Sequence, residues 1–230
     1  MVDLNRVNQQ TLIQYFDNGS FLVNLADIHK LYHHPLLLKH TNEINILYRY
    51  LKNYVAKPNP EVGRSDPVCP FTPGALRTKS MFFSITNNTL DTEEKQRKIE
   101  HIFLEYLKIF LEMHPTSGRT KYLKAIVMVF SKVFEGNYEL IEVVQQRLKA
   151  TFTNHGLMIG QFYPTCPSPG IHNPEYRPLQ SPLPLLVIRH MMPVDYFFLT
   201  EYQEAYFKTY PKNHPPEARA YFEQYNRGII

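Results

Sequence analysis

Two apolar runs bracket a proline-dense loop: GLMIGQF at residues 156–162 and LPLLVIRHM at residues 183–191. Each run is short, rich in branched aliphatic side chains and bounded by turn residues, which is typical of a buried strand. Seven of the 18 prolines of the chain lie between Pro164 and Pro184, so the connection is expected to be stiff and ordered. The two runs therefore predict two strands joined by a rigid loop.

Two further apolar runs, at residues 80–86 and 124–130, also predict strands, and the second should be buried on both faces. Helical periodicity of three and four residues surrounds these runs. It predicts one helix at residues 41–55, with the apolar positions Ile44, Leu47, Tyr48, Leu51 and Val55. A second helix follows a cap at Asp91, with the apolar positions Ile99, Ile102, Phe103, Tyr106, Leu107, Phe110 and Leu111. A third follows a cap at Asn137 and ends at Gly156. This order predicts an α+β fold: a single mixed sheet of at least four strands flanked by helices, whose last two strands can pair directly.

The N-terminal part predicts helices at residues 8–16 and 26–32, and residues 57–66 resemble an exposed connection. We therefore expect a helical N-terminal segment, residues 1–56, packed on an α+β core domain, residues 57–230, with one globular domain overall. Residues 195–210 and 216–226 are expected to form closing helices.

Composition and charge exclude several classes of protein. The formal net charge of +4 comes from scattered Lys and Arg residues, whereas nucleic-acid binding typically needs a concentrated basic stripe. Neither a signal pattern nor a run of about 18 apolar residues is present, so we expect a cytoplasmic protein that binds neither nucleic acid nor membrane. In a reducing compartment Cys69 and Cys166 should stay as two thiols.

Cys69 precedes Pro70, which holds the cysteine backbone in an extended conformation on a loop. Such a cysteine can present its sulfur to a cavity, and a cysteine thiolate is one of the ligands that hold haem iron. The alternative is that Cys69 is a small buried apolar residue beside a turn. The dipeptide alone does not decide between them.

The proline-rich loop carries Cys166, His172 and Arg177. His172 lies between residues that restrain its backbone, which suits a catalytic histidine that transfers a proton, although a histidine that bonds loop carbonyls is an equal alternative. Arg177 is a candidate to bind a substrate carboxylate or a haem propionate. Cys166 and His172 lack the ligand spacing of a zinc site.

Arg189 and His190 stand at the end of the second apolar run. An unpaired guanidinium in an apolar strand is costly, so Arg189 should have a carboxylate partner from the protein, a substrate or a propionate. His190 is a second candidate for binding the substrate or a propionate, but it should point to the opposite face of the sheet.

Elsewhere, His29, His33 and His34 form the densest histidine group and are expected to lie at the surface, because no acidic residue accompanies them at ligand spacing. The chain also lacks the Gly-rich nucleotide-binding motifs and the Gly-x-Ser-x-Gly motif of hydrolases.

Four segments together resemble an uncharacterised bacterial family of soluble proteins over residues 60–200: VCPF (68–71), GLMIGQF (156–162), PGIHNPEYRPL (169–179) and IRHM (188–191). The Cys-Pro-Phe element ahead of a strand, helix and strand is more distantly similar to the YqcI/YcgG family of haem-dependent enzymes, which N-oxygenate amines and guanidines of amino acids in specialised metabolism. This resemblance implies that Cys69 is the thiolate ligand of haem iron. It also implies that His172, Arg177 and Arg189 form the distal wall or bind propionates and a substrate carboxylate.

We therefore expect a haem-thiolate oxidoreductase, a monooxygenase that activates oxygen or peroxide to oxidise a small amino-acid-like metabolite and draws on an electron donor. Two alternatives stay open. One is a cofactor-free module that binds a small carboxylate ligand through Arg177 or Arg189. The other is a thiol-dependent transferase with Cys69 as nucleophile and His172 as base.

Overall fold

The computed structural model describes residues 13–15, 21–31, 33–86, 92–131, 137–199 and 203–210. Its centre is one mixed sheet of six strands in the order β1-β2-β3-β4-β6-β5. The strands are β1 (Ile13–Tyr15), β2 (Phe21–Asn24), β3 (Met81–Thr86), β4 (Ala125–Phe130), β5 (Leu157–Phe162) and β6 (Leu185–His190). Only β3 and β4 run parallel, and every other neighbouring pair is antiparallel.

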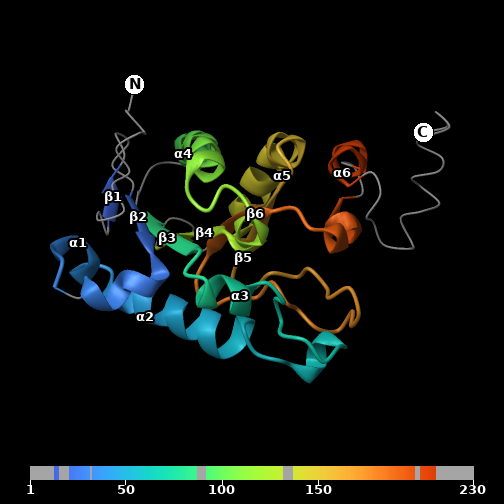
Figure 1. Cartoon of the computed structure of the whole chain (residues 1–230), viewed down its shortest axis with the longest axis horizontal. Helices are drawn as coiled ribbons and strands as arrows, with labels where there is room; N and C mark the ends of the chain where they lie inside the picture. Colours follow the sequence, from blue (N-terminus) through green and yellow to red (C-terminus); the bar gives the residue numbers. More distant parts are fainter. Residues whose placement is uncertain are drawn as a thin grey trace.

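Helices cover both faces of this sheet (Figure 1). One face carries α4 (Thr92–Glu112) and α5 (Glu139–Asn154), with α6 (Gln203–Thr209) beside α5; the other carries α1 (Pro35–Leu38), α2 (Thr41–Tyr50) and α3 (Thr72–Arg77). A π-helical turn η3 (Leu51–Val55) extends α2. Short 3-10 helices occupy connections: η2 (Leu25–Lys30), η4 (Pro60–Val62), η5 (Arg119–Leu123) and η6 (Pro193–Phe198).

Strand β4 contributes to the two largest hydrophobic clusters among the described residues, because side chains alternate along a strand. Ile126, Met128 and Phe130 pack under α4 and α5, and Val127 and Val129 pack on the other face, towards α2 and η3. All six residues of β4 are buried. A strand covered on both faces must be apolar throughout, which is why this run was so clear in the sequence.

The structure confirms the α+β class, the single mixed sheet and the four strands predicted from the sequence. The last two strands do pair directly, and β6 lies between β4 and β5. The helix at residues 41–55 is present as α2 and η3, but its buried residues include Tyr50, whereas Tyr48 is exposed. Tyr50 follows the buried Leu47 by three residues, so it lies on the buried face of α2 at ordinary helical spacing. On α4, Leu111 is exposed, although the predicted stripe included it.

The prediction of a helical N-terminal segment needs correction. Residues 13–15 form strand β1 rather than a helix, and residues 21–24 form β2, which pairs with β3. The predicted helix at 26–32 is the 3-10 helix η2. Pairing with the sheet outweighs the local helical pattern here, because it satisfies the backbone groups of these short segments. Residues 8–12 and 16, also predicted as helix, lie outside the described residues.

Helix ends differ from prediction in two more places. Helix α5 begins at Glu139 after Tyr138, so Asn137 does not cap it. The closing helix expected at 195–210 is divided between η6 and α6. The Asp91 cap and the helix at 216–226 lie outside the described residues.

Candidate functional site

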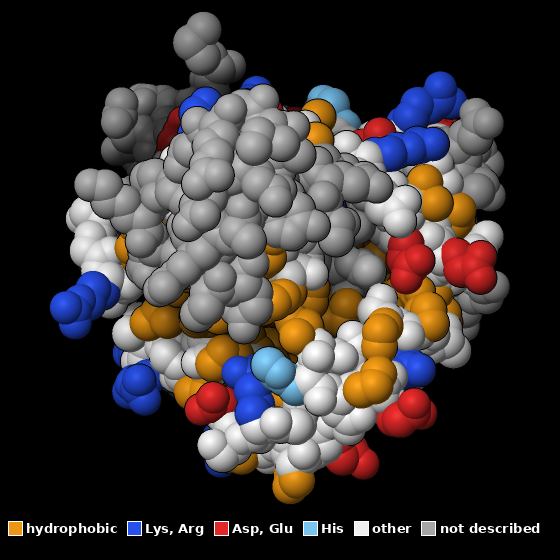
Figure 2. Space-filling view, turned by 90° about the vertical axis from the view of Figure 1, so that its right-hand side faces the viewer, with side chains coloured by type: hydrophobic (Ala, Val, Ile, Leu, Met, Phe, Trp, Pro, Cys, Tyr) orange, Lys and Arg blue, Asp and Glu red, His pale blue; other side chains and the backbone are white. Residues whose placement is uncertain are grey.

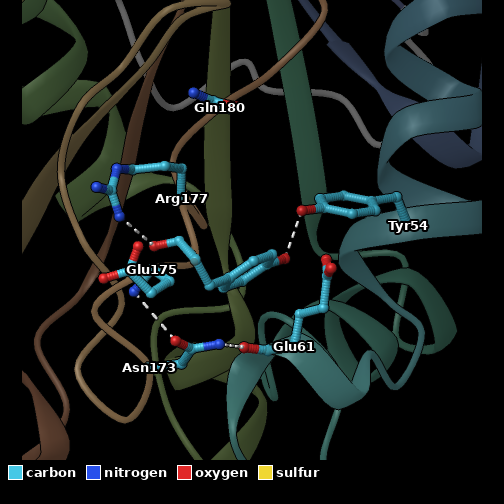
Figure 3. Close-up of a pocket in the computed structure, with 7 residues that line it drawn as sticks. Tyr54, Glu61, Asn173, Glu175, Arg177 and Gln180 are labelled. Carbon is cyan, nitrogen blue, oxygen red and sulfur yellow. Dashed lines mark hydrogen bonds between the residues drawn. The ribbon is translucent and has the colours of Figure 1, made fainter.

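A cavity of about 380 Å³ lies between two segments that are distant in the sequence (Figure 3). One segment is η3 with the turn after it, and the other is the loop between β5 and β6. We call this the polar cavity; it is lined by Tyr54, Glu61, Asn173, Glu175, Tyr176, Arg177 and Gln180. Its volume lies within the range of small-molecule sites.

A pair of tyrosine hydroxyls joins the two walls of the polar cavity. The hydroxyl of Tyr54 forms a hydrogen bond with that of Tyr176 (Figure 3), and the Asn59 side-chain amide donates to Tyr176 at 3.3 Å. The Tyr54 ring stacks on Tyr50, with centroids 5.4 Å apart. Burial raises the pKa of Tyr176, and the hydrogen bond with Tyr54 raises it further. The Tyr176 hydroxyl is therefore neutral at physiological pH.

Hydrogen bonds between side chains and backbone groups fix the loop that carries the other wall of the polar cavity. The Asn173 side-chain amide donates to the backbone carbonyl of Glu61 at 2.8 Å, and its oxygen accepts from the backbone N–H of Glu175 at 3.0 Å. The Tyr50 hydroxyl donates to the backbone carbonyl of Gln180 at 3.1 Å. Side chains from η3 and η4 therefore meet a wall that is already held in place.

The charged groups of the polar cavity have no ion-pair partner within the described part of the chain. Glu61 and Glu175 form no salt bridge there, and neither does Arg177, whose Nη1 donates to the backbone carbonyls of Pro174 and Tyr176. In Figure 3 Glu61 lies on the side of Tyr54, and Glu175 lies on the side of Arg177. Charges without protein partners in a cavity are available to a ligand.

Arg189 has a protein partner. Its guanidinium donates two hydrogen bonds of 2.6 Å to the two carboxylate oxygens of Asp195, which is completely buried. Burial alone lowers the pKa of Arg189, but Asp195 outweighs this effect and raises the pKa above its ordinary value, with a smaller contribution from Cys69. The guanidinium also lies 5.5 Å from the centre of the Phe71 ring. Of the partners expected for Arg189, the protein itself supplies the carboxylate.

Cys69 lies on the loop before α3, within electrostatic reach of Arg189. Its backbone N–H donates to the carbonyl of Val55 at 3.0 Å, and its carbonyl accepts from the N–H of Thr72 at 3.2 Å. The side chain is partly exposed and packs at the edge of the cluster that contains Phe83. The loop therefore holds the thiol in a fixed position near a permanent positive charge.

On the face of β6 that carries Arg189, the sheet at β5 and β6 is incompletely covered. Gly160 and Val187 are paired residues on this face, and both are partly exposed although β6 is an interior strand. A Cβ atom placed on Gly160 would meet only the ring of Phe162, at 3.4 Å. Figure 2 shows a hollow with hydrophobic side chains on one face of the molecule. We call the space over Gly160, Phe162 and Val187 the Gly160 hollow.

The remaining predicted residues lie apart from these two places. His190 points to the opposite face from Arg189, as predicted, and packs between the rings of Phe110 and Tyr122, at 5.2 and 5.4 Å. Burial, with Lys124 and Lys121, lowers its pKa to about 4. It is therefore neutral at physiological pH and is not placed to assist Arg189.

His172 is exposed, and its Cβ lies where a side chain on Gly63 would collide, so the histidine marks a close approach of two loops. Cys166 is fully buried, with its sulfur 3.6 Å from the Ser168 hydroxyl. In the N-terminal histidine group, Nδ1 of His34 accepts from the backbone N–H of Leu36 at 3.2 Å and begins α1. His34 thus has a structural role.

Sequence reasoning missed several residues of these places. Tyr54 and Glu61 match no motif, and Tyr176 entered only as part of the PGIHNPEYRPL segment, more than a hundred residues from the other two. Gly160 did carry a signal, since glycine inside an apolar strand often marks a site where another group approaches the backbone. Asp195 carried one too, because an acidic residue in the first turn of a helix often accepts backbone hydrogen bonds.

No group of three or more His, Cys, Asp or Glu side chains that could hold a metal ion occurs in the described ranges. Over the same residues, the helices are all too short or too polar to cross a membrane.

The fold and the cavity define an α+β protein with a six-stranded mixed sheet and a polar cavity. Residues 44–224 match the model of the family described as a domain of unknown function, DUF6875, and the chain belongs to that family. No curated protein and no solved structure matches the chain.

Proposed function

We propose that this protein is a haem-thiolate oxidoreductase in which Cys69 holds the iron and the Gly160 hollow receives the macrocycle. The observation that carries the proposal is the partly exposed apolar face at Gly160 and Val187, on the same face of β6 as Arg189, the charge within electrostatic reach of the partly exposed Cys69. A flat apolar group needs an apolar surface without projecting side chains, and a strand glycine provides one. Haem needs one protein ligand, so the lack of a three-ligand cluster among the described residues does not bear on it.

Arg189 is a positive charge within electrostatic reach of Cys69. It stays charged because Asp195 holds it with two hydrogen bonds. We therefore propose that Arg189 acts through its charge and does not bind a propionate, because its guanidinium is already paired with Asp195. A thiolate ligand supplies electron density that favours oxygen–oxygen bond cleavage.

The reaction class that follows is oxidation of a small metabolite with oxygen or peroxide, with electrons from a separate donor when oxygen is used. Around the reacting group, Phe162 and Val187 provide apolar walls that exclude water. We propose a cytoplasmic location, because a reducing compartment keeps Cys69 as a thiol.

The test is an ultraviolet–visible spectrum of the full chain expressed with added haem precursor, before and after reduction under carbon monoxide. We expect a Soret band that Cys69→Ala removes or shifts and that Cys166→Ala leaves in place, since Cys166 is buried elsewhere. Gly160→Leu should lower haem uptake by filling the hollow, and circular dichroism should show that it still folds. A protein that takes up no haem, or a band unchanged in Cys69→Ala, contradicts the proposal. In the first case, inactivation by a thiol-alkylating reagent would point to the transferase alternative.

A further inference from the structure

The walls of the polar cavity carry more negative than positive charge. Two carboxylates, Glu61 and Glu175, face one guanidinium, Arg177, and none of the three has an ion-pair partner in the described part of the chain. Nη1 of Arg177 is already engaged by two backbone carbonyls. Charge complementarity therefore favours a ligand with net positive charge.

The side of the cavity near Glu61 is rich in hydrogen-bond acceptors. The negative charge of Glu61 lies close enough to Tyr176 to act on its hydroxyl. Within the Tyr54–Tyr176 pair one O–H donates to the other oxygen, and the Asn59 amide also donates to Tyr176. Tyr54 accepts no hydrogen bond from Asn59, so its oxygen can accept one from a ligand. A carboxylate beside two such oxygens suits an ammonium or guanidinium group, which offers several N–H donors.

We infer that the polar cavity binds a small organic cation, with its cationic nitrogen between Glu61 and the Tyr54–Tyr176 hydroxyl pair. A metal ion fits the site less well, because no group of three or more His, Cys, Asp or Glu ligands gathers there or elsewhere in the residues that the structure describes. Arg177 offsets part of the negative charge and leaves room for an oxygen acceptor on its side of the cavity. This inference stands on the cavity alone and does not depend on haem.

The inference predicts opposite effects for two neutralising substitutions. Glu61→Gln removes the charge that binds the cation and should weaken binding by about tenfold or more, because a charged hydrogen bond is lost. Arg177→Gln removes a like charge and should strengthen the binding of a cation that lacks a carboxylate. Both variants should fold, since the loop is held through the backbone carbonyl of Glu61 and the side chain of Asn173.

The probe is agmatine, an aliphatic guanidine with an amino group and no carboxylate, titrated calorimetrically into the full-length protein at low ionic strength. Butyrate and butyramide serve as the anionic and neutral comparison ligands. Glu112→Gln is the matched control, because Glu112 is exposed at the end of α4, away from the cavity. We expect agmatine alone to bind, with Glu61→Gln weaker, Arg177→Gln tighter and Glu112→Gln unchanged.

Three results would overturn the inference: no binding of agmatine, agmatine affinity that Glu61→Gln leaves unchanged, or binding of butyrate that Arg177→Gln abolishes. The last result would establish a carboxylate ligand held by Arg177. A Soret band, if present, should be the same in wild type and Glu61→Gln, so the fate of this inference is separate from that of the haem proposal.

Discussion

Removal of the Asp195 carboxylate should destabilise the protein strongly. Asp195 is completely buried and accepts three hydrogen bonds, two of 2.6 Å from the Arg189 guanidinium and one of 2.7 Å from the backbone N–H of Met192. In Asp195→Ala the guanidinium loses its partner while only 24 % of its side chain reaches solvent. Breaking a buried ion pair from one side costs about 3–5 kcal/mol of unfolding free energy. A typical domain has about 5–15 kcal/mol in total.

The decisive measurement is a double-mutant cycle with Arg189→Met, Asp195→Leu and the combined variant. Each single variant leaves one buried charge alone, and the combined variant leaves none, so it should lose much less stability than the sum of the two. Urea unfolding followed by far-ultraviolet circular dichroism suits this chain, which contains no tryptophan.

The exposed pair of Lys30 and Asp27 provides the control, because Asp27→Ala removes a 2.6 Å salt bridge at the surface. That change should cost about 1 kcal/mol or less. Our account of Arg189 is refuted if the two single variants at the buried pair each lose under about 1 kcal/mol, or if their effects add to within about 0.5 kcal/mol.

Three further predictions concern single positions. Burial, with Lys124, lowers the pKa of His190 to about 4. The unfolded chain therefore binds more protons than the folded chain between pH 6.5 and 4, so the free energy of unfolding should fall as the pH drops through this window. In His190→Leu it should fall less. Urea titrations at pH 7 and pH 5 measure this, and an identical pH dependence in the two proteins would contradict it. The hydroxyl of Ser84 is buried without a hydrogen-bond partner among the described residues, so Ser84→Ala should leave the unfolding free energy unchanged or raise it by up to about 1 kcal/mol; a clear loss would reveal a partner. Gly63 has φ +80°, and a Cβ there would lie 3.0 Å from the Cβ of His172. Gly63→Ala should therefore lower the free energy of unfolding by about 1–3 kcal/mol, measured by thermal or urea unfolding. An unchanged value would show that the two loops separate freely.

Much of the sheet follows from the sequence, because a strand covered on both faces must be continuously apolar. That rule identified β3, β4, β5 and β6. It failed for β2, whose four residues Phe21–Asn24 are too few to show a period. Helical spacing did not distinguish Tyr48, four residues after Ile44, from Tyr50, three residues after Leu47, and only Tyr50 is buried in the fold.

The two candidate places were predictable to different degrees. Alternation along a strand separated Arg189 from His190, and the cost of burying a bare guanidinium required a carboxylate, which proved to be Asp195. The polar cavity was not predictable in this way. Glu61 lies in a stretch that resembles an exposed connection, and only the fold brings it to Asn173, whose amide it meets across 112 residues of chain. Local sequence patterns contain no information about such a meeting.

The connection between β5 and β6 has a consequence for how the protein can change. Its two ends, Phe162 and Leu185, are directly paired residues of adjacent strands, so residues 163–184 form a ring closed by the sheet, with a gap of about 5 Å at its base. A closed ring can be rewritten in sequence without altering the register of the strands that close it. The wall of the polar cavity formed by the loop between β5 and β6 can therefore be exchanged, whereas the opposite wall belongs to η3 and η4. Transplanting residues 163–184 between members of the family is a direct way to exchange ligand preference while the sheet stays the same.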